Sequence, residues 1–203
     1  TMDSTSNVRG APPLIVATGG TITTCGNCKI HTFTGPGTFC VSAAAACSAN
    51  NVVSYLVVAG GGAGGRNHGG AGGAGGYREV KSPVTPYTAS PLDGYPSAPN
   101  RVTVTATAFP ITVGAGGAKD AGCNAGATVG TQGSTSTFST ISSAGGGGGG
   151  AEGAQANGGS GGSGGGSSYS CGAGSGNTPP VSPPQGNNGG SGPTGAPGYP
   201  GSA

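Results

Sequence analysis

Glycine returns at a period of three residues in separate blocks along this chain. Three xGG triplets follow one another over residues 68–76, and three more cover residues 157–165. The same spacing recurs in the last part of the chain at Gly189, Gly192, Gly195, Gly198 and Gly201. A repeat of three is the period of an extended polyproline-II-type helix, whereas an α-helix repeats every 3.6 residues and a strand every two. The blocks therefore predict packed, extended glycine segments, because a flexible linker has no need for such a period.

The physical reason for this spacing lies in the peptide groups. A helix with three residues per turn has no internal hydrogen bonds, so every N–H and C=O group needs a partner outside it. Neighbouring segments can provide those partners if no Cβ atom lies between them, and glycine allows this approach at a cost of roughly 0.5–1 kcal/mol per residue relative to alanine. We therefore expect the glycine block at residues 145–176 to be ordered although its composition resembles a linker.

The composition fits a packed protein with few charges. Glycine and proline, with 49 and 16 residues, make up about a third of the 203 residues, which by itself suggests low complexity. However, only 6% of the residues are charged, so repulsion does not keep the chain expanded, and the apolar residues gather in short runs. The net charge of +2 without a basic cluster argues against nucleic acid as a partner. No stretch is apolar and long enough for membrane insertion.

Short apolar runs between turn signals predict strands at residues 14–17, 21–25, 28–33, 38–42, 52–59, 77–80, 102–106, 111–113 and 135–142. The run 52–59 is the most apolar and both of its faces look buried, so we expect it at the centre of a sheet. No run has helical periodicity. The predicted fold is therefore all-β, with β-sandwich-like sheets combined with packed glycine-rich (polyglycine-II-like) helices and essentially no α-helix.

The composition changes along the chain predict three parts. Residues 1–13 form a leader or linker, which lacks the basic and apolar regions of a signal peptide. Residues 14–176 form a glycine-rich β domain, whose glycine blocks are 60–76, 114–133 and 145–176. Residues 177–203 form a Pro/Gly-rich extended tail, of which we expect the part from Gly189 to Gly201 to lie against a neighbouring chain. The chain is either part of a longer protein or reaches the outside by another route, such as cell lysis.

Several motifs in a fixed order carry a family resemblance. Residues 29–39, 53–62, 75–79 and 111–117, followed by 136–138, 144–150 and 183–190, resemble the glycine-rich domain of bacteriophage tail fibres and related virion adhesins. The resemblance covers roughly residues 11–192. More weakly, the order of strand, glycine block and strand is similar to the glycine-rich extracellular region of anaplastic lymphoma kinase. In the family pattern a closing strand rich in valine and isoleucine follows, and it is missing before Ala203.

The resemblance implies a structural virion protein that acts in host attachment. It implies self-association as a homotrimer or fibre, and a host cell-surface receptor that is a glycan or an outer-membrane protein. The location would be the virion or the extracellular space. No enzyme and no cofactor are expected, because no set of nucleophile, base and acid is visible in the sequence. The alternative is an extracellular structural filament or matrix protein that polymerises.

Six cysteines lie outside the family pattern: Cys25, Cys28, Cys40, Cys47, Cys123 and Cys171. Cys25 and Cys28 form a CxxC motif, which is compatible with redox chemistry or zinc, but a second close pair is missing. The even number favours disulfides, and free thiols or a metal site remain open. Among the possible pairings we prefer Cys25–Cys28, Cys40–Cys47 and Cys123–Cys171.

Tyrosines are the candidates for receptor contact, because exposed aromatic residues on loops often anchor binding. The candidates are Tyr77, Tyr87, Tyr95 and Tyr169, with Tyr199 in the tail. The alternative is that these rings pack over bare glycine backbone. The loop 83–100, which carries Tyr87 and Tyr95, is the best candidate for a recognition surface.

Overall fold

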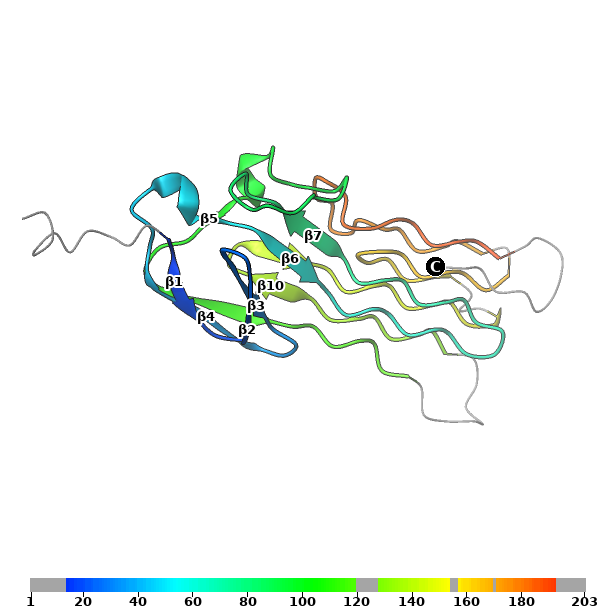
Figure 1. Ribbon diagram of the computed structural model, residues 1–203. Coiled ribbons are helices and arrows are strands. Elements are labelled where there is room, and N and C mark those ends of the chain that lie inside the picture. Colours follow the sequence, from blue (N-terminus) through cyan, green and yellow to red (C-terminus); the bar gives the residue numbers. More distant parts are fainter. Residues whose placement is uncertain (1–13, 120–127, 154–156, 170, 193–203) are drawn as a thin grey trace, which may run out of the picture.

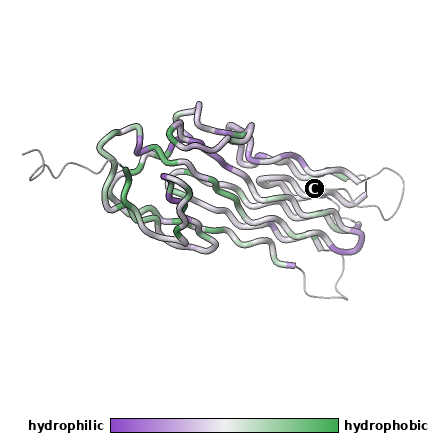
Figure 2. Tube along the Cα trace, in the orientation of Figure 1, coloured by the Kyte–Doolittle hydropathy of each residue, from purple (hydrophilic) through white to green (hydrophobic). Residues whose placement is uncertain are grey.

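The computed structural model describes residues 14–119, 128–153, 157–169 and 171–192. The protein is elongated, with β-strands at one end and extended glycine-rich segments that run from the strands to the other end (Figure 1). Figure 2 shows that the most hydrophobic residues lie at the strand end, while the glycine segments are nearly neutral in hydropathy. No helix in the described residues has the length and apolar character needed to cross a bilayer.

The strands form antiparallel sheets. The largest has five strands in the order β1 (Val16–Thr18), β4 (Gly37–Ala43), β9 (Ala108–Thr112), β10 (Ser136–Phe138) and β11 (Ile141–Ser143). Two-stranded sheets are formed by β2 (Thr21–Cys25) with β3 (Cys28–Thr32), β5 (Val52–Val53) with β8 (Val102–Thr103), and β6 (Tyr55–Val58) with β7 (Tyr77–Val80). The helical turns in the described residues are the 3₁₀ turns η1 (Ser48–Asn51) and η2 (Ala98–Asn100), so the all-β prediction is confirmed.

A small aromatic core holds the sheets together. Along β4, Phe39 and Val41 point inward, as the alternation of a strand requires. The Phe39 and Phe138 rings meet edge to face with centroids 6.1 Å apart, and Tyr55 meets Phe138 in the same manner at 5.9 Å. Val57, Val102, Val104 and Ile141 complete the buried cluster.

The expectation of a central strand over residues 52–59 is wrong. The strand is interrupted at Ser54, whose Oγ accepts a hydrogen bond from the Ser82 N–H at 2.8 Å and lies 2.6 Å from the Thr85 hydroxyl. The part after the break, β6, pairs only with β7, and Leu56 and Val58 are 59% and 51% exposed. Apolar composition predicted a strand here, but it could not show that only one face of that strand is covered.

The glycine blocks form a packed array of extended segments, which we call the glycine lattice. The N–H groups of Gly60 and Ala63 donate to the C=O groups of Ser134 and Thr131, at 3.0 and 2.8 Å. The Gly62 N–H donates to Gly73 on another segment, at 2.8 Å. Donors three residues apart therefore face the same neighbour, and intervening donors face a different one. This confirms the period of three. The described residues of the block 145–176 are ordered in the same way, since the Gly147 N–H donates to Ser163 at 2.9 Å and the Gly161 N–H to Ser175 at 3.0 Å.

The hydrogen bonds place the segments in three rows. The first row contains residues 114–118, 59–65 and 69–76. The middle row contains residues 128–134, 144–150, 163–168 and 186–192, and the third row contains 157–162 and 171–176. The segment 144–150 exchanges hydrogen bonds with neighbours in all three rows and is buried along its whole length.

Burial explains where the lattice requires glycine. A Cβ atom built on Gly147 would lie 1.9 Å from the Gly159 carbonyl oxygen, and one on Gly148 would lie 1.6 Å from that of Gly130. This central segment therefore has an unbroken run of glycines, whereas the peripheral segment 69–76 has an xGG pattern in which Ala71 and Ala74 are exposed. The positive-φ glycines of the described chain, Gly19, Gly20, Gly26 and Gly153, lie outside these segments. Close approach, and not an unusual backbone angle, is what glycine provides here.

The first part of the predicted tail packs on its own chain. The side chain of Gln185 is buried, and its Oε1 accepts the Ala144 N–H at 2.8 Å while its backbone C=O accepts the Tyr77 N–H at 2.9 Å. The Gly189 N–H then donates to Gly174 at 2.9 Å. Residues 177–192 thus join the lattice of their own chain. The contact with a neighbouring chain was expected for residues 189–201, of which 193–201 lie outside the described part.

Substitution of lattice glycines should prevent folding. A Cβ on Gly161 would lie 2.4 Å from both the Gly145 oxygen and the Gly147 nitrogen, and one on Gly164 would lie 1.9 Å from the Gly174 oxygen. We expect the double variant Gly161→Val/Gly164→Val to lose cooperative thermal unfolding. Gly35→Val is the control, because a Cβ at Gly35 meets no atom within 4 Å. Equal melting temperatures for all three proteins would contradict the packed lattice.

Candidate functional site

The proline- and tyrosine-rich loop 81–100 is folded onto β7. The Gly94 N–H donates to the Glu79 carbonyl at 2.9 Å, and the Lys81 N–H donates to Asp93 Oδ1 at 3.0 Å. Glu79 and Asp93 also form an isolated parallel bridge. The loop is therefore anchored at both its start and its middle to one strand.

Glu79 is the centre of this attachment. Its carboxylate is buried and accepts hydrogen bonds from the Tyr77 hydroxyl at 2.9 Å, from the Ser90 N–H at 3.1 Å and from the Ser90 hydroxyl. Burial acts to raise the pKa of Glu79, but the hydrogen bonds from Ser90, Tyr77 and Tyr87 outweigh it and hold the pKa below its ordinary value. Burial and the Glu79 carboxylate also raise the pKa of Tyr87 to about 12.

Asn100 joins the loop to β7 and to the C-terminal stretch. Its Oδ1 accepts a hydrogen bond from the buried Arg78 guanidinium at 2.6 Å, and its Nδ2 donates to the Ser182 carbonyl at 2.8 Å. Next to it, the Arg101 guanidinium lies 4.5 Å from the centre of the Tyr95 ring, within the range of a cation–π contact. These contacts fix the end of the loop.

The structure separates the predicted tyrosines into two groups. Tyr77 and Tyr87 meet at Glu79, and Tyr95 lies on Arg101 in the same loop region. The hydroxyl of Tyr77 is thus used inside the fold, whereas the Tyr87 side chain is 40% exposed. Tyr169 lies elsewhere, beside Glu152 on the lattice, and Tyr199 is outside the described residues. Glu79, Asn100 and Arg78 could not be found from the sequence, because their partners are distant in the chain.

A second cluster lies among the turns at the end of the lattice away from the strands (Figure 1). We call His68, Glu152 and Tyr169 the distal turn cluster. The Tyr169 hydroxyl donates to Glu152 Oε1 at 2.8 Å, and this hydrogen bond raises the pKa of Tyr169. His68 Nδ1 lies 3.8 Å from Glu152 Oε2, and the Ser168 hydroxyl donates to the His68 carbonyl at 2.9 Å. The cluster joins residues from three turns.

Three of the five non-glycine residues with positive φ in the described chain lie in the same turns, and the other two are Ser139 and Asn177. Asn67, His68 and Tyr169 have φ values of 47°, 55° and 55°, in the left-handed region that residues other than glycine rarely adopt. A histidine and a tyrosine there cost on the order of 1–3 kcal/mol each unless their surroundings hold them. Nothing in the sequence placed Glu152 next to His68.

The cysteines within the described residues are free thiols: Cys25, Cys28, Cys40, Cys47 and Cys171. The preferred disulfides Cys25–Cys28 and Cys40–Cys47 are therefore not formed. Cys25 and Cys28 face each other across the β2–β3 turn, where the backbone ladder already closes the hairpin. Cys40 lies within β4, whereas Cys47 follows the end of that strand and caps η1. Cys123 lies outside the described residues, so the pair Cys123–Cys171 is not addressed.

No group of three or more metal-ligating side chains forms in the part of the chain that the structure describes. His31 is occupied within the fold, since its Nδ1 lies 2.8 Å from the Gly19 carbonyl and its ring meets Phe39 edge to face at 4.9 Å. The distal turn cluster offers one carboxylate and one imidazole, which is fewer ligands than a structural zinc site uses. The polar clusters thus serve hydrogen bonding and charge interaction.

Comparison with known proteins identifies a family over most of the chain. The family model described as a glycine-rich domain matches residues 33–203. The chain belongs to this glycine-rich domain family. No curated protein and no solved structure matches the chain. The family match begins at Phe33, so it includes all the lattice segments and most of the strands of this glycine-rich domain.

The attachment of loop 81–100 should depend on pH. The pKa of Glu79 is lower in the folded protein than its ordinary value of 4.5, so its carboxylate stabilises the fold above that value. This stabilisation is lost as the pH falls from about 4.5 through the lower pKa of the folded state. We expect Glu79→Gln to be less stable than the parent at pH 7, with a difference that shrinks toward pH 3. Denaturant unfolding of both proteins measures this, and a pH-independent difference would contradict it.

The thiols should be accessible without denaturation. Cys25, Cys40 and Cys47 are exposed, so they should react with a thiol reagent in the folded protein. Titration before and after denaturation, without reductant, makes the comparison. A protein that shows almost no free thiol even when denatured would support the disulfides that the cysteine count suggested.

Proposed function

We propose that this glycine-rich domain is a structural virion protein, part of a phage tail fibre or adhesin, and that it acts in host attachment. The support is the order of motifs that resembles such adhesins, together with a fold that is a stiff rod of packed peptide segments. The proposal includes self-association and a virion or extracellular location. The receptor is a cell-surface glycan or an outer-membrane protein.

The observation that carries the proposal is the distal turn cluster. The flanks of the rod are largely bare peptide and small side chains, while its end presents a histidine, a carboxylate and an aromatic ring. His68 and Glu152 side chains are 61% and 42% exposed. The left-handed conformations of His68 and Tyr169 are compatible with a recognition surface, since strained residues concentrate at binding sites. An anchored end with polar and aromatic groups is suited to contact a receptor.

A binding role explains these residues better than catalysis. His68 and Glu152 lie close together, but the hydrogen bond from the Tyr169 hydroxyl to the same carboxylate raises the pKa of Tyr169, which disfavours its nucleophilic phenolate form. No hydrogen-bonded set of nucleophile, base and orienting group is formed by the residues that the structure describes. We therefore propose that the domain is not an enzyme and needs no cofactor.

The alternative function is an extracellular filament or matrix protein that polymerises. The first row of the lattice favours it, because its outer side carries peptide groups without partners among the residues that the structure describes. A filament would show the same contact repeated along its axis, whereas an adhesin would be found at the ends of virion fibres. Electron microscopy of native particles distinguishes the two.

Alanine substitution in the distal turn cluster should weaken attachment to cells. We expect the fluorescently labelled chain to bind cells of a bacterial host strain, and His68→Ala/Tyr169→Ala to bind roughly 10-fold or more weakly, as loss of an aromatic anchor does. The matched control is Tyr87→Ala, which removes an exposed tyrosine at the strand end and should bind as the parent does. Circular dichroism confirms that the variants are folded.

The variant Tyr169→Phe separates contact from folding. It keeps the ring but removes the hydroxyl that donates to Glu152. Partial loss of binding with an unchanged melting temperature supports direct contact. If only Tyr87→Ala loses binding, the receptor contacts loop 81–100 and not the distal turn cluster. If the parent chain binds no cell, host attachment is contradicted.

A further inference from the structure

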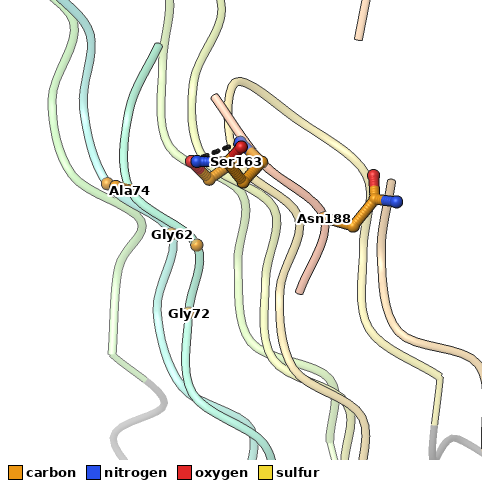
Figure 3. A pocket seen from close by; sticks show the side chains of 8 residues that line it. Gly62, Gly72, Ala74, Ser163 and Asn188 are labelled. Atoms are coloured by element: carbon orange, nitrogen blue, oxygen red, sulfur yellow. Dashed lines mark hydrogen bonds between the residues drawn. The ribbon is translucent and has the colours of Figure 1, made fainter. Parts of the chain in front are cut away.

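A groove of about 490 Å³ runs along the outer side of segment 69–76. It is lined by Gly61, Gly62, Gly72, Gly73 and Ala74 of the first row and by Ser163, Asn187 and Asn188 of the middle row (Figure 3). In Figure 3, Gly62, Gly72 and Ala74 lie on one side, and the side chains of Ser163 and Asn188 stand across from them. The groove is thus bordered largely by peptide backbone.

Peptide groups beside this groove have no partner within the described chain. The N–H groups of Gly61 and Gly64 donate no hydrogen bond, and on the neighbouring segment the C=O groups of Gly72 and Gly75 accept none. In the segment of Gly61 and Gly64, the N–H groups of Gly60 and Gly62 are bonded to neighbours on two other sides. The free groups repeat every three residues, which is the spacing that joins segments inside the lattice.

Two of these glycines are not explained by the packing of their own chain. A Cβ on Gly61 would lie 3.6 Å from the nearest atom, the Gly73 oxygen, and one on Gly64 would lie 3.5 Å from the Gly70 oxygen. These are ordinary contact distances, and neither residue has a positive φ. By contrast, a Cβ on Gly72 would lie 2.1 Å from the Gly62 oxygen. Alanine would therefore fit at Gly61 and Gly64 in an isolated chain, as it does at the exposed positions Ala71 and Ala74.

We propose that this side of the first row, from Gly61 to Gly64 and along the groove, binds the same edge of a second copy of the chain. The occupant must offer free N–H and C=O groups at three-residue spacing and must lack Cβ atoms, and this edge itself has both properties. Segments 59–65 and 69–76 carry no charged side chain, so two copies do not repel each other there. At the strand end the exposed Leu56 and Val58 directly precede segment 59–65 and add apolar area. A contact between identical surfaces gives a closed dimer.

The test is the association of the full chain, measured by sedimentation velocity across a concentration series. We expect the parent to associate, and Gly61→Ala/Gly64→Ala to associate about tenfold or more weakly, because the added Cβ atoms keep the two backbones apart. The melting temperature of the variant, measured below the concentration of association, should not fall. Gly35→Ala is the matched control, since it makes the same change between β3 and β4, away from the groove, where a Cβ atom meets nothing within 4 Å.

Gly72→Ala provides the comparison with a packing defect inside the chain, because its Cβ would lie 2.1 Å from the Gly62 oxygen. It should lower the melting temperature at every concentration. A parent chain that stays monomeric, or a Gly61→Ala/Gly64→Ala variant that associates as the parent does, overturns the inference. The inference rests on the self-association in the proposed function and gives it the form of a two-fold dimer, where the family resemblance implied a homotrimer or fibre. The two are distinguishable, since cell binding can be measured at concentrations where the chain is monomeric.

Discussion

Hydrogen bonds between peptide groups of separate extended segments are the interaction on which the structure depends. Each contributes about 1 kcal/mol net, which is similar to the cost of fixing one residue. A single pair of segments would therefore not be stable. The array becomes stable because segment 144–150 shares its peptide groups with neighbours in all three rows, so that ordering one segment helps to order several.

The strands and the polar contacts around them hold the segments in register. β6 and β7 lead into and out of the first glycine block, and β10 and β11 stand between the second and third, so each sheet pairing fixes where a glycine segment starts. Gln185 continues this role at the boundary, where it bonds both the Tyr77 N–H and the Ala144 N–H. The buried Glu79 attaches loop 81–100 to the same strand pair. Most of the side-chain hydrogen bonds at the strand end thus hold the strands and loop 81–100 in place.

The distal turns differ in character from the rest of the lattice. Along the central run from Gly145 to Gly149 a Cβ atom cannot be accommodated, whereas at the turns the chain exposes His68, Glu152 and Tyr169 together. The rod therefore confines its larger polar and aromatic groups to places where segments reverse direction. This division between a backbone-only body and side-chain-bearing ends is consistent with our proposal that recognition lies at the turns, and with our inference that bare flanks join copies of the chain.

The sequence determined the class of fold, because the period of three glycines permits close peptide contacts that any Cβ would block, and the alternating runs outside the blocks suit strands. It could not determine which segments are neighbours. The xGG pattern shows that one residue in three faces outward, but the order of the rows depends on how distant strands pair. For the same reason the sequence failed at residues 52–59, where burial of one face was mistaken for burial of both. Only the tertiary structure brought Glu152 to His68 and Tyr169, since turns far apart in the chain meet only after the lattice has assembled.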